Sequence, residues 1–199
     1  LAAVDLIKNK ILKRSSETDR DEIAGIWDEI FGNNGKVDSS SHNNFLRQYH
    51  LSHSDFITKQ QIYSAYSKEI SKLASQPTLM SWIRELHSSA DDYFKFKNIF
   101  NGDVAYFNDN IGIQNLLLLL KKTGSIQWYS IAFSISKALR EEPSIKEEAN
   151  KTLWLLLNLI IRFVLLNERF NKIETRLPLI ARSIWGKNAF RFTDKTDQD

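Results

Sequence analysis

The sequence predicts an all-α protein, a single multi-helix domain of about eight or nine helices. Apolar residues recur at helical spacing along nearly the whole chain, and no convincing stretch shows the period of two that a β-strand needs. The 199 residues include only 7 glycines and 3 prolines, too few for a many-turned sandwich or barrel. A hydrophobic content of 42%, with 12% aromatic residues, also excludes a disordered chain.

The first half of the chain carries clear helix signals. Apolar residues at i, i+3, i+4, i+7 and i+8 form one stripe between Ile23 and Phe31. Thr18 stands in the N-cap position before this stripe, and Gly32 follows it, where a left-handed C-terminal cap is expected. The Asn- and Ser-rich stretch 33–41 is the clearest loop. The predicted helices of this half are an opening amphipathic helix within 1–15 and the segments 18–31, 45–50, 57–73 and 79–96.

The second half is predicted to hold four more helices. The stretch 97–110 is irregular, either a loop or a short helical turn, and it precedes a helix over 111–122 that ends at Thr123–Gly124. Ser125 is expected to cap the next helix, which runs to Arg140, and Ser144 to cap the long helix that follows. Pro178 lies inside the final helical pattern, over 170–184, and should kink that helix or start a new one.

The long helix near 145–167 is predicted to be buried. Its apolar run, Leu153–Leu166, holds 14 residues with two polar ones among them, whereas a membrane-spanning helix needs about 20 nearly uncharged residues. We therefore expect no membrane association and a cytoplasmic protein. Apolar residues fill the rest of this run, so neighbours should surround the helix. Its polar residues fall within about 40° of one another around the axis, at Lys151, Asn158, Arg162 and Arg169. This polar strip is either a solvent-facing line of long side chains or a seam where another domain or DNA docks.

No catalytic motif is found in the sequence. The chain has no cysteine, no G-x-S-x-G elbow and no glycine-rich phosphate loop. Carboxylates that are adjacent in sequence, such as Asp91 and Asp92, do not face each other on a helix and make no catalytic pair. The triplet starting at His42 resembles part of an HNH nuclease motif but opens a helix after a Ser-rich loop, so we reject that interpretation. The sequence therefore predicts no catalytic residue in this chain.

The four histidines raise the possibility of a metal site. His50 and His53 are one helical turn apart, but His42 and His87 lie at other spacings, and Asp55 is the nearest carboxylate in sequence. Zinc needs three or four ligands at defined positions. Histidines at the surface or packed against loops explain the pattern better. We predict no metal site and no cofactor, and a metal-dependent hydrolase ranks third among the functions considered.

Basic residues are concentrated in the last quarter of the chain. Residues 151–195 contain 9 Lys and Arg against 3 Asp and Glu, a local charge of 9 − 3 = +6 within a chain whose net charge is +3. Such a segment would attract phosphates in a salt-dependent way, or it is simply a solvated positive face. The candidate nucleic-acid-binding residues are Arg162, Arg169, Lys172, Arg176, Arg182, Lys187 and Arg191.

Several stretches resemble a known family in their order along the chain. They are AAVDLIKNKIL (2–12), NNFLRQYHLSHSDFITKQQIYSAY (43–66), SWIRELHSSADDYFKF (81–96) and LIIRFVLLNERFNKIETRLPLIARSI (159–184). These stretches are similar to the helical region of GmrSD-type proteins, modification-dependent (type IV) restriction enzymes of phage defence. In that family a ParB-like N-terminal domain carries a D-G-Q-Q-R-like nucleotide-handling motif, and a C-terminal domain carries the HNH nuclease residues. Neither motif occurs here.

The resemblance implies a non-catalytic helical connector, residues 1–185, cut from a longer chain. Residues 186–199 would then begin a linker to a downstream domain. Its partners would be the other domains of the parent protein, a DNA endonuclease, and DNA is a further candidate partner. The alternative is a stand-alone protein–protein interaction module that docks partners through the aromatic residues Trp185, Phe190 and Phe192.

Overall fold

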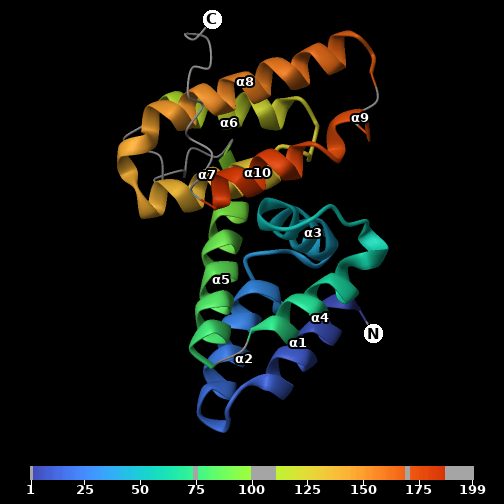
Figure 1. Cartoon of the computed structure of the whole chain (residues 1–199), viewed down its shortest axis with the longest axis vertical. Coiled ribbons are helices and arrows are strands. Elements are labelled where there is room, and N and C mark those ends of the chain that lie inside the picture. Colours follow the sequence, from blue (N-terminus) through green and yellow to red (C-terminus); the bar gives the residue numbers. More distant parts are fainter. Residues whose placement is uncertain (1, 74–75, 100–110, 169–170, 187–199) are drawn as a thin grey trace, which may run out of the picture. The chain divides into compact units, whose positions relative to one another are not determined.

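The chain folds into helices wherever its structure is described. The computed structural model describes residues 2–73, 76–99, 111–168 and 171–186. Within these ranges all regular elements are helical, so the all-α prediction is confirmed. Ten α-helical segments follow one another there, one of them only four residues long. They form two compact units, one of Leu1–His50 with Ile57–Phe94 and one of Leu51–Phe56 with Lys95–Asp199 (Figure 1).

The first unit is built around its third helix, α3. Its helices are α1 (Ala3–Arg14), α2 (Glu17–Phe31), α4 (Ile62–Lys72), and most of α3 (His42–His53) and of α5 (Gln76–Asn98). The last residues of α3 and α5, after His50 and Phe94, belong to the second unit. In Figure 1, α1 runs beside α4 and α2. Every residue of α3 from Phe45 to His50 is buried. The Phe45 ring contacts the rings of Phe31 and Tyr93, at centroid distances of 5.9 and 5.4 Å, so α3 joins α2 to α5 through one aromatic cluster.

The ends of α2 differ from the prediction. The N-cap is Ser16 and not Thr18: the Ser16 hydroxyl accepts a hydrogen bond from the Asp19 amide at 3.1 Å, and Thr18 bonds to the Ser16 hydroxyl. Gly32 ends the helix as expected, but with an extended backbone (φ −66°, ψ 178°), so the expected left-handed cap is wrong. A Cβ atom at Gly32 would collide with the Asp28 carbonyl, which explains the glycine without a positive φ.

The second unit is built around α7. Its helices are α6 (Ile111–Lys122), α7 (Tyr129–Glu141), α8 (Lys146–Leu165), α9 (Asn171–Glu174) and α10 (Leu177–Trp185). As Figure 1 shows, α10 runs beside α7 and α8 runs beside α6. Every residue of α7 from Ser130 to Ser136 is buried. Small side chains allow this, because Ser and Ala let neighbouring helices approach closely. The Ser134 hydroxyl lies within hydrogen-bond distance of the carbonyl oxygens of Ser52 and Ser130, at 3.0 and 3.1 Å, so it has an acceptor although it is buried.

The connections of the second unit confirm some predicted boundaries and correct others. Gly124 has a φ of +72° just after α6, so the predicted stop holds. Neither Ser125 nor Ser144 is an N-cap: α7 begins after Trp128, and α8 begins after a 3-10 turn over Pro143–Ile145. Pro178 lies in the first turn of α10, so it starts a new helix. The irregular stretch was predicted over 97–110, but α5 continues to Asn98. Residues 100–110, and the tail from 187 onward, lie outside the described residues.

Candidate interaction surface

The long helix α8 is covered on one side only. Its core residues point to one side and are at most 5% exposed, at Ala149, Leu153, Leu156, Leu157 and Ile160. The large apolar side chains on its other sides are 40–78% exposed, at Trp154, Leu155, Ile161, Leu165 and Leu166. The prediction of a long helix surrounded by neighbours is therefore wrong. The helix that neighbours surround in this unit is α7. Its serine and alanine residues do not form the long apolar run that predicts a buried helix.

The polar strip of α8 lies opposite its core side. At about 100° per residue, Lys151, Asn158 and Arg162 lie about 180° around the axis from the line of buried residues. Lys151 and Arg162 are exposed, and Asn158 donates a hydrogen bond to the Trp154 carbonyl at 2.9 Å. We call this side of the helix the outer face of α8; it comprises Lys151, Trp154, Leu155, Asn158, Ile161, Arg162, Leu165 and Leu166.

The outer face of α8 thus has a cationic centre with apolar residues on both sides. Trp154, Ile161 and Leu165 flank the polar strip on one side, and Leu155 and Leu166 flank it on the other. Neither Lys151 nor Arg162 forms an ion pair with a described residue. Several large apolar side chains exposed together and bordered by polar residues are typical of interaction sites. This arrangement can hold a second amphipathic element.

Only part of the predicted basic set falls in the described structure. Arg162 is exposed on α8, and Arg176 is exposed at the N-terminal end of α10. Arg182 of α10 is also exposed, but its guanidinium forms an ion pair with the Asp55 carboxylate, which offsets its charge. Of the three arginines of this predicted set that the structure describes, Arg162 and Arg176 have no carboxylate partner among the described residues. Arg169, Lys187 and Arg191, and the side chain of Lys172, lie outside the described part.

Trp185, one of the three aromatic residues proposed to dock partners of a stand-alone interaction module, is partly covered. The Trp185 ring is half-buried against the His53 ring, at a centroid distance of 5.0 Å, and the Lys137 ammonium lies 5.2 Å from the Trp185 ring centroid. A docking edge at Trp185 would have to displace these contacts. Phe190 and Phe192 lie outside the described residues.

A buried polar cluster in the first unit involves His50. Its Nδ1 lies 3.2 Å from a carboxylate oxygen of Glu69, and the other oxygen of Glu69 accepts a hydrogen bond from the Trp82 indole at 2.7 Å. The nearest carboxylate is therefore Glu69 of α4, 19 residues away, and not Asp55, as sequence distance had suggested. The three side chains come from α3, α4 and α5, so their contacts tie these helices together.

Tyr66 lies next to this cluster. Its hydroxyl donates to the Leu46 carbonyl at 2.8 Å, and its ring contacts the rings of His50 and Trp82, at centroid distances of 5.6 and 6.1 Å. Burial, and to a smaller extent the charges of Glu69 and Tyr49, raises the pKa of Tyr66 well above its ordinary value of 10.0.

We expect Tyr66 to make the folded state sensitive to alkali. The unfolded chain loses the Tyr66 proton near pH 10 while the folded chain keeps it, so stability is full below pH 10 and falls as the pH rises toward the folded pKa. The decline approaches about 1.4 kcal/mol per pH unit for one group. Denaturant titrations at several alkaline pH values should give a shallower decline for Tyr66→Phe. Tyr63→Phe, at a tyrosine 40% exposed, is the control and should keep the wild-type slope. Equal slopes for all three proteins would contradict the assignment.

His87 belongs to a second, more open polar cluster. Its Nε2 lies 2.7 Å from the Lys36 ammonium and 2.8 Å from a Glu29 carboxylate oxygen, and Lys36 also pairs with Asp91 at 2.7 Å. One ring nitrogen cannot accept from Lys36 and donate to Glu29 at the same time, so the tautomer of His87 selects its partner. A bond to Lys36 fastens the loop after α2 to α5, and a bond to Glu29 fastens α2 itself to α5. These contacts give His87 a structural role.

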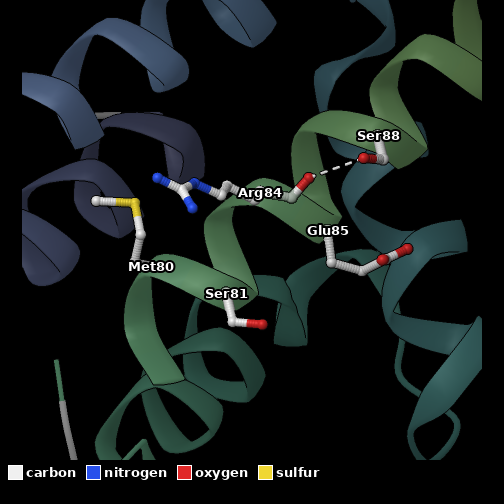
Figure 2. Close-up of a pocket in the computed structure, with 5 residues that line it drawn as sticks. All are labelled: Met80, Ser81, Arg84, Glu85 and Ser88. Atoms are coloured by element: carbon white, nitrogen blue, oxygen red, sulfur yellow. Dashed lines mark hydrogen bonds between the residues drawn. The ribbon is translucent and has the colours of Figure 1, made fainter. Parts of the chain in front are cut away.

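The first unit also has a shallow depression on α5. It has a volume of about 440 Å³ and is lined by Met80, Ser81, Arg84, Glu85 and Ser88, all from the outer side of one helix (Figure 2). The Arg84 guanidinium is held by Glu22 at 2.8 Å, and the Ser88 hydroxyl donates to the Arg84 carbonyl at 3.0 Å. Figure 2 shows Met80 and Arg84 extending away from Ser81 and Glu85. The lining groups do not converge on a common point, so the depression offers no organised ligand site.

No family model matches this chain, and neither does any curated protein or solved structure. In the part of the chain that the structure describes, no helix is both long and apolar enough to cross a lipid bilayer.

Proposed function

We propose that this chain is a non-catalytic helical domain of a GmrSD-like DNA restriction protein of phage defence. It positions the nucleotide-handling and nuclease domains of the parent protein, a cytoplasmic modification-dependent endonuclease. The observation that carries this proposal is the outer face of α8, where apolar side chains 40–78% exposed flank a polar line. The order of family-like stretches along the sequence supports the choice of parent.

The docking role has a direct physical rationale. Leu155 and Leu165 are 55% and 78% exposed, and burying such side chains against another domain is worth about 1–2 kcal/mol each. A helix of 20 residues is about 30 Å long, which suits it to bridge two neighbouring domains. The stand-alone interaction module remains the alternative, because the same outer face could receive a separate protein.

A pull-down separates these two functions. The tagged chain would be tested against the nucleotide-handling and nuclease sections of its own full-length reading frame, each expressed as a separate polypeptide. We expect the wild-type chain to bind at least one section and the double variant Leu155→Asp, Leu165→Asp to lose binding by at least about tenfold. Ile111→Asp is the control, because Ile111 is 69% exposed at the N-terminal end of α6, where an acidic residue suits the helix dipole. Failure of the wild-type chain to bind either section would refute the connector role and leave the stand-alone module.

DNA contact is the second arm of the proposal. Arg176, which lies outside the outer face of α8, is exposed and has no acidic partner among the described residues, whereas Arg182 is paired with Asp55. A duplex-DNA titration across salt concentrations should show affinity that falls steeply with salt and is reduced by Arg176→Gln. Arg182→Gln should matter less, because Asp55 already offsets that charge. Absence of binding even at low salt would remove DNA from the proposal.

A further inference from the structure

We propose that the outer face of α8 selects an amphipathic helix that carries carboxylates along the middle of its own apolar side. This inference rests on the proposed docking role of the same face and names the chemistry of its partner. The deciding feature is the position of the charge. Lys151 and Arg162 occupy the centre of the face, with Trp154 and Leu155 on either side, and neither cation has a carboxylate partner among the described residues.

A membrane surface does not fit this order of residues. A helix that lies in a bilayer interface places the middle of its exposed face deepest and keeps its charged residues at the edges. On α8 the order is reversed, so docking on lipid would push Lys151, Asn158 and Arg162 deepest into the apolar layer. Burying charges there is costly.

A second copy of the chain brings like charges together when two α8 helices are centred on one another. In antiparallel orientation Lys151 of one would then lie opposite Arg162 of the other, and in parallel orientation each cation would lie opposite its own copy, which disfavours association. An antiparallel pair shifted by about four residues would instead bring Arg162 near Glu147 and Glu148, which are exposed on the same side of α8, so dimerisation is an outcome that the test must distinguish.

Nucleic acid is also disfavoured at this face. Its two cations are 11 residues apart, about 16 Å along the helix, and apolar side chains fill the space around them. Affinity for a phosphate backbone grows with the number of neutralised phosphates, and two cations supply little of it. Trp154 and Leu155 would gain nothing against phosphates.

An acidic amphipathic helix satisfies every part of the face. Its apolar flanks would cover Trp154, Ile161 and Leu165 on one side of the strip and Leu155 and Leu166 on the other. Two carboxylates 11 residues apart fall within about 20° on a helix, so they can meet Lys151 and Arg162 together. Trp and Arg are the residue types that most often dominate binding energy at interfaces. Glu147 and Glu148 precede Lys151 in the first turn of α8, so Arg162 should contribute more of the selectivity.

Two synthetic helices test the charge rule with the full chain. Both are labelled amphipathic peptides of about 20 residues with a leucine-rich side, and they differ only in carrying glutamate or lysine at two central positions 11 residues apart. Fluorescence anisotropy should show the glutamate peptide binding about tenfold more tightly than the lysine peptide. The double variant Lys151→Glu, Arg162→Glu should reverse this preference, and Lys151→Arg, Arg162→Lys should keep it. Circular dichroism checks that each variant is folded.

The possible outcomes separate this inference from the docking role. If both peptides bind equally and Leu155→Asp abolishes binding, the charge rule is wrong and the docking role stands. If Leu155→Asp changes nothing, both fail. No binding of the glutamate peptide, or an unchanged preference after charge reversal, overturns the inference. So does dimerisation in light scattering, or binding to phosphatidylglycerol vesicles or duplex DNA, when Leu155→Asp or the charge reversal abolishes it.

Discussion

Replacing Trp128 with alanine should lower the free energy of unfolding by about 3–5 kcal/mol, the largest effect that we expect from one substitution. Trp128 is 0% exposed, its ring stacks on that of Tyr129 at a centroid distance of 4.1 Å, and it meets the Phe96 ring at 5.7 Å. Truncation would open a cavity at the start of α7, the helix around which the second unit is built. Denaturant unfolding followed by circular dichroism measures the change.

Two tryptophan variants serve as controls for this prediction. Trp128→Phe keeps most of the ring and removes a buried indole N–H that has no acceptor among the described residues, so it should cost less than about 1.5 kcal/mol. Trp154→Ala makes the same chemical change as Trp128→Ala at a side chain 54% exposed on α8, and should cost less than about 1 kcal/mol. A large loss for Trp154→Ala would show that the outer face of α8 is covered in the free chain.

Replacing Ser134 with leucine should be the second most damaging change, with a loss of about 2–5 kcal/mol. Ser134 is 0% exposed in the middle of α7, and its hydroxyl lies within hydrogen-bond distance of the Ser52 carbonyl. A leucine there would force neighbouring helices apart and remove the hydrogen bond from Ser134 to that carbonyl. Thermal and denaturant unfolding would both report the loss.

The matched control for Ser134→Leu is Ser183→Leu. Ser183 is exposed on α10 and its hydroxyl bonds only to the Ile180 carbonyl of its own helix, at 2.9 Å. Leucine at that site should change stability by no more than about 0.5 kcal/mol. If the two serine variants were equally stable, α7 would not be the tightly surrounded helix that we describe.

Helix periodicity predicted much of this fold correctly. In α2, Ile23, Trp27 and Ile30 were expected on one apolar stripe, and all three are buried. The fresh start at Pro178 and the stop at Gly124 were also readable, because a proline ring and a positive φ are local constraints. Cap residues were harder: Ser16, and not Thr18, caps α2, since two hydroxyl residues stood close together and only the path of the chain decides between them.

The candidate surface was only half predictable. The sequence placed Lys151, Asn158 and Arg162 on one line of the long helix and left open whether that line was a solvent face or a docking seam. It did not predict that Trp154 and Leu155 beside that line are exposed. The presence of an apolar residue on a helix does not show whether a neighbouring helix covers its side chain. That depends on how many helices lie within reach, and along α8 only one side is packed.

What the sequence determined by itself was therefore everything local: that the chain is helical, roughly where its helices lie, and which residues share a side of each one. Only the tertiary structure decided which helix is surrounded. The leucine-rich α8 lies at the surface with one side packed, and the serine- and alanine-containing α7 lies at the centre of its unit. The physical reason is that small side chains let several helices approach one axis closely, whereas large apolar ones can fill a single contact and still extend into solvent.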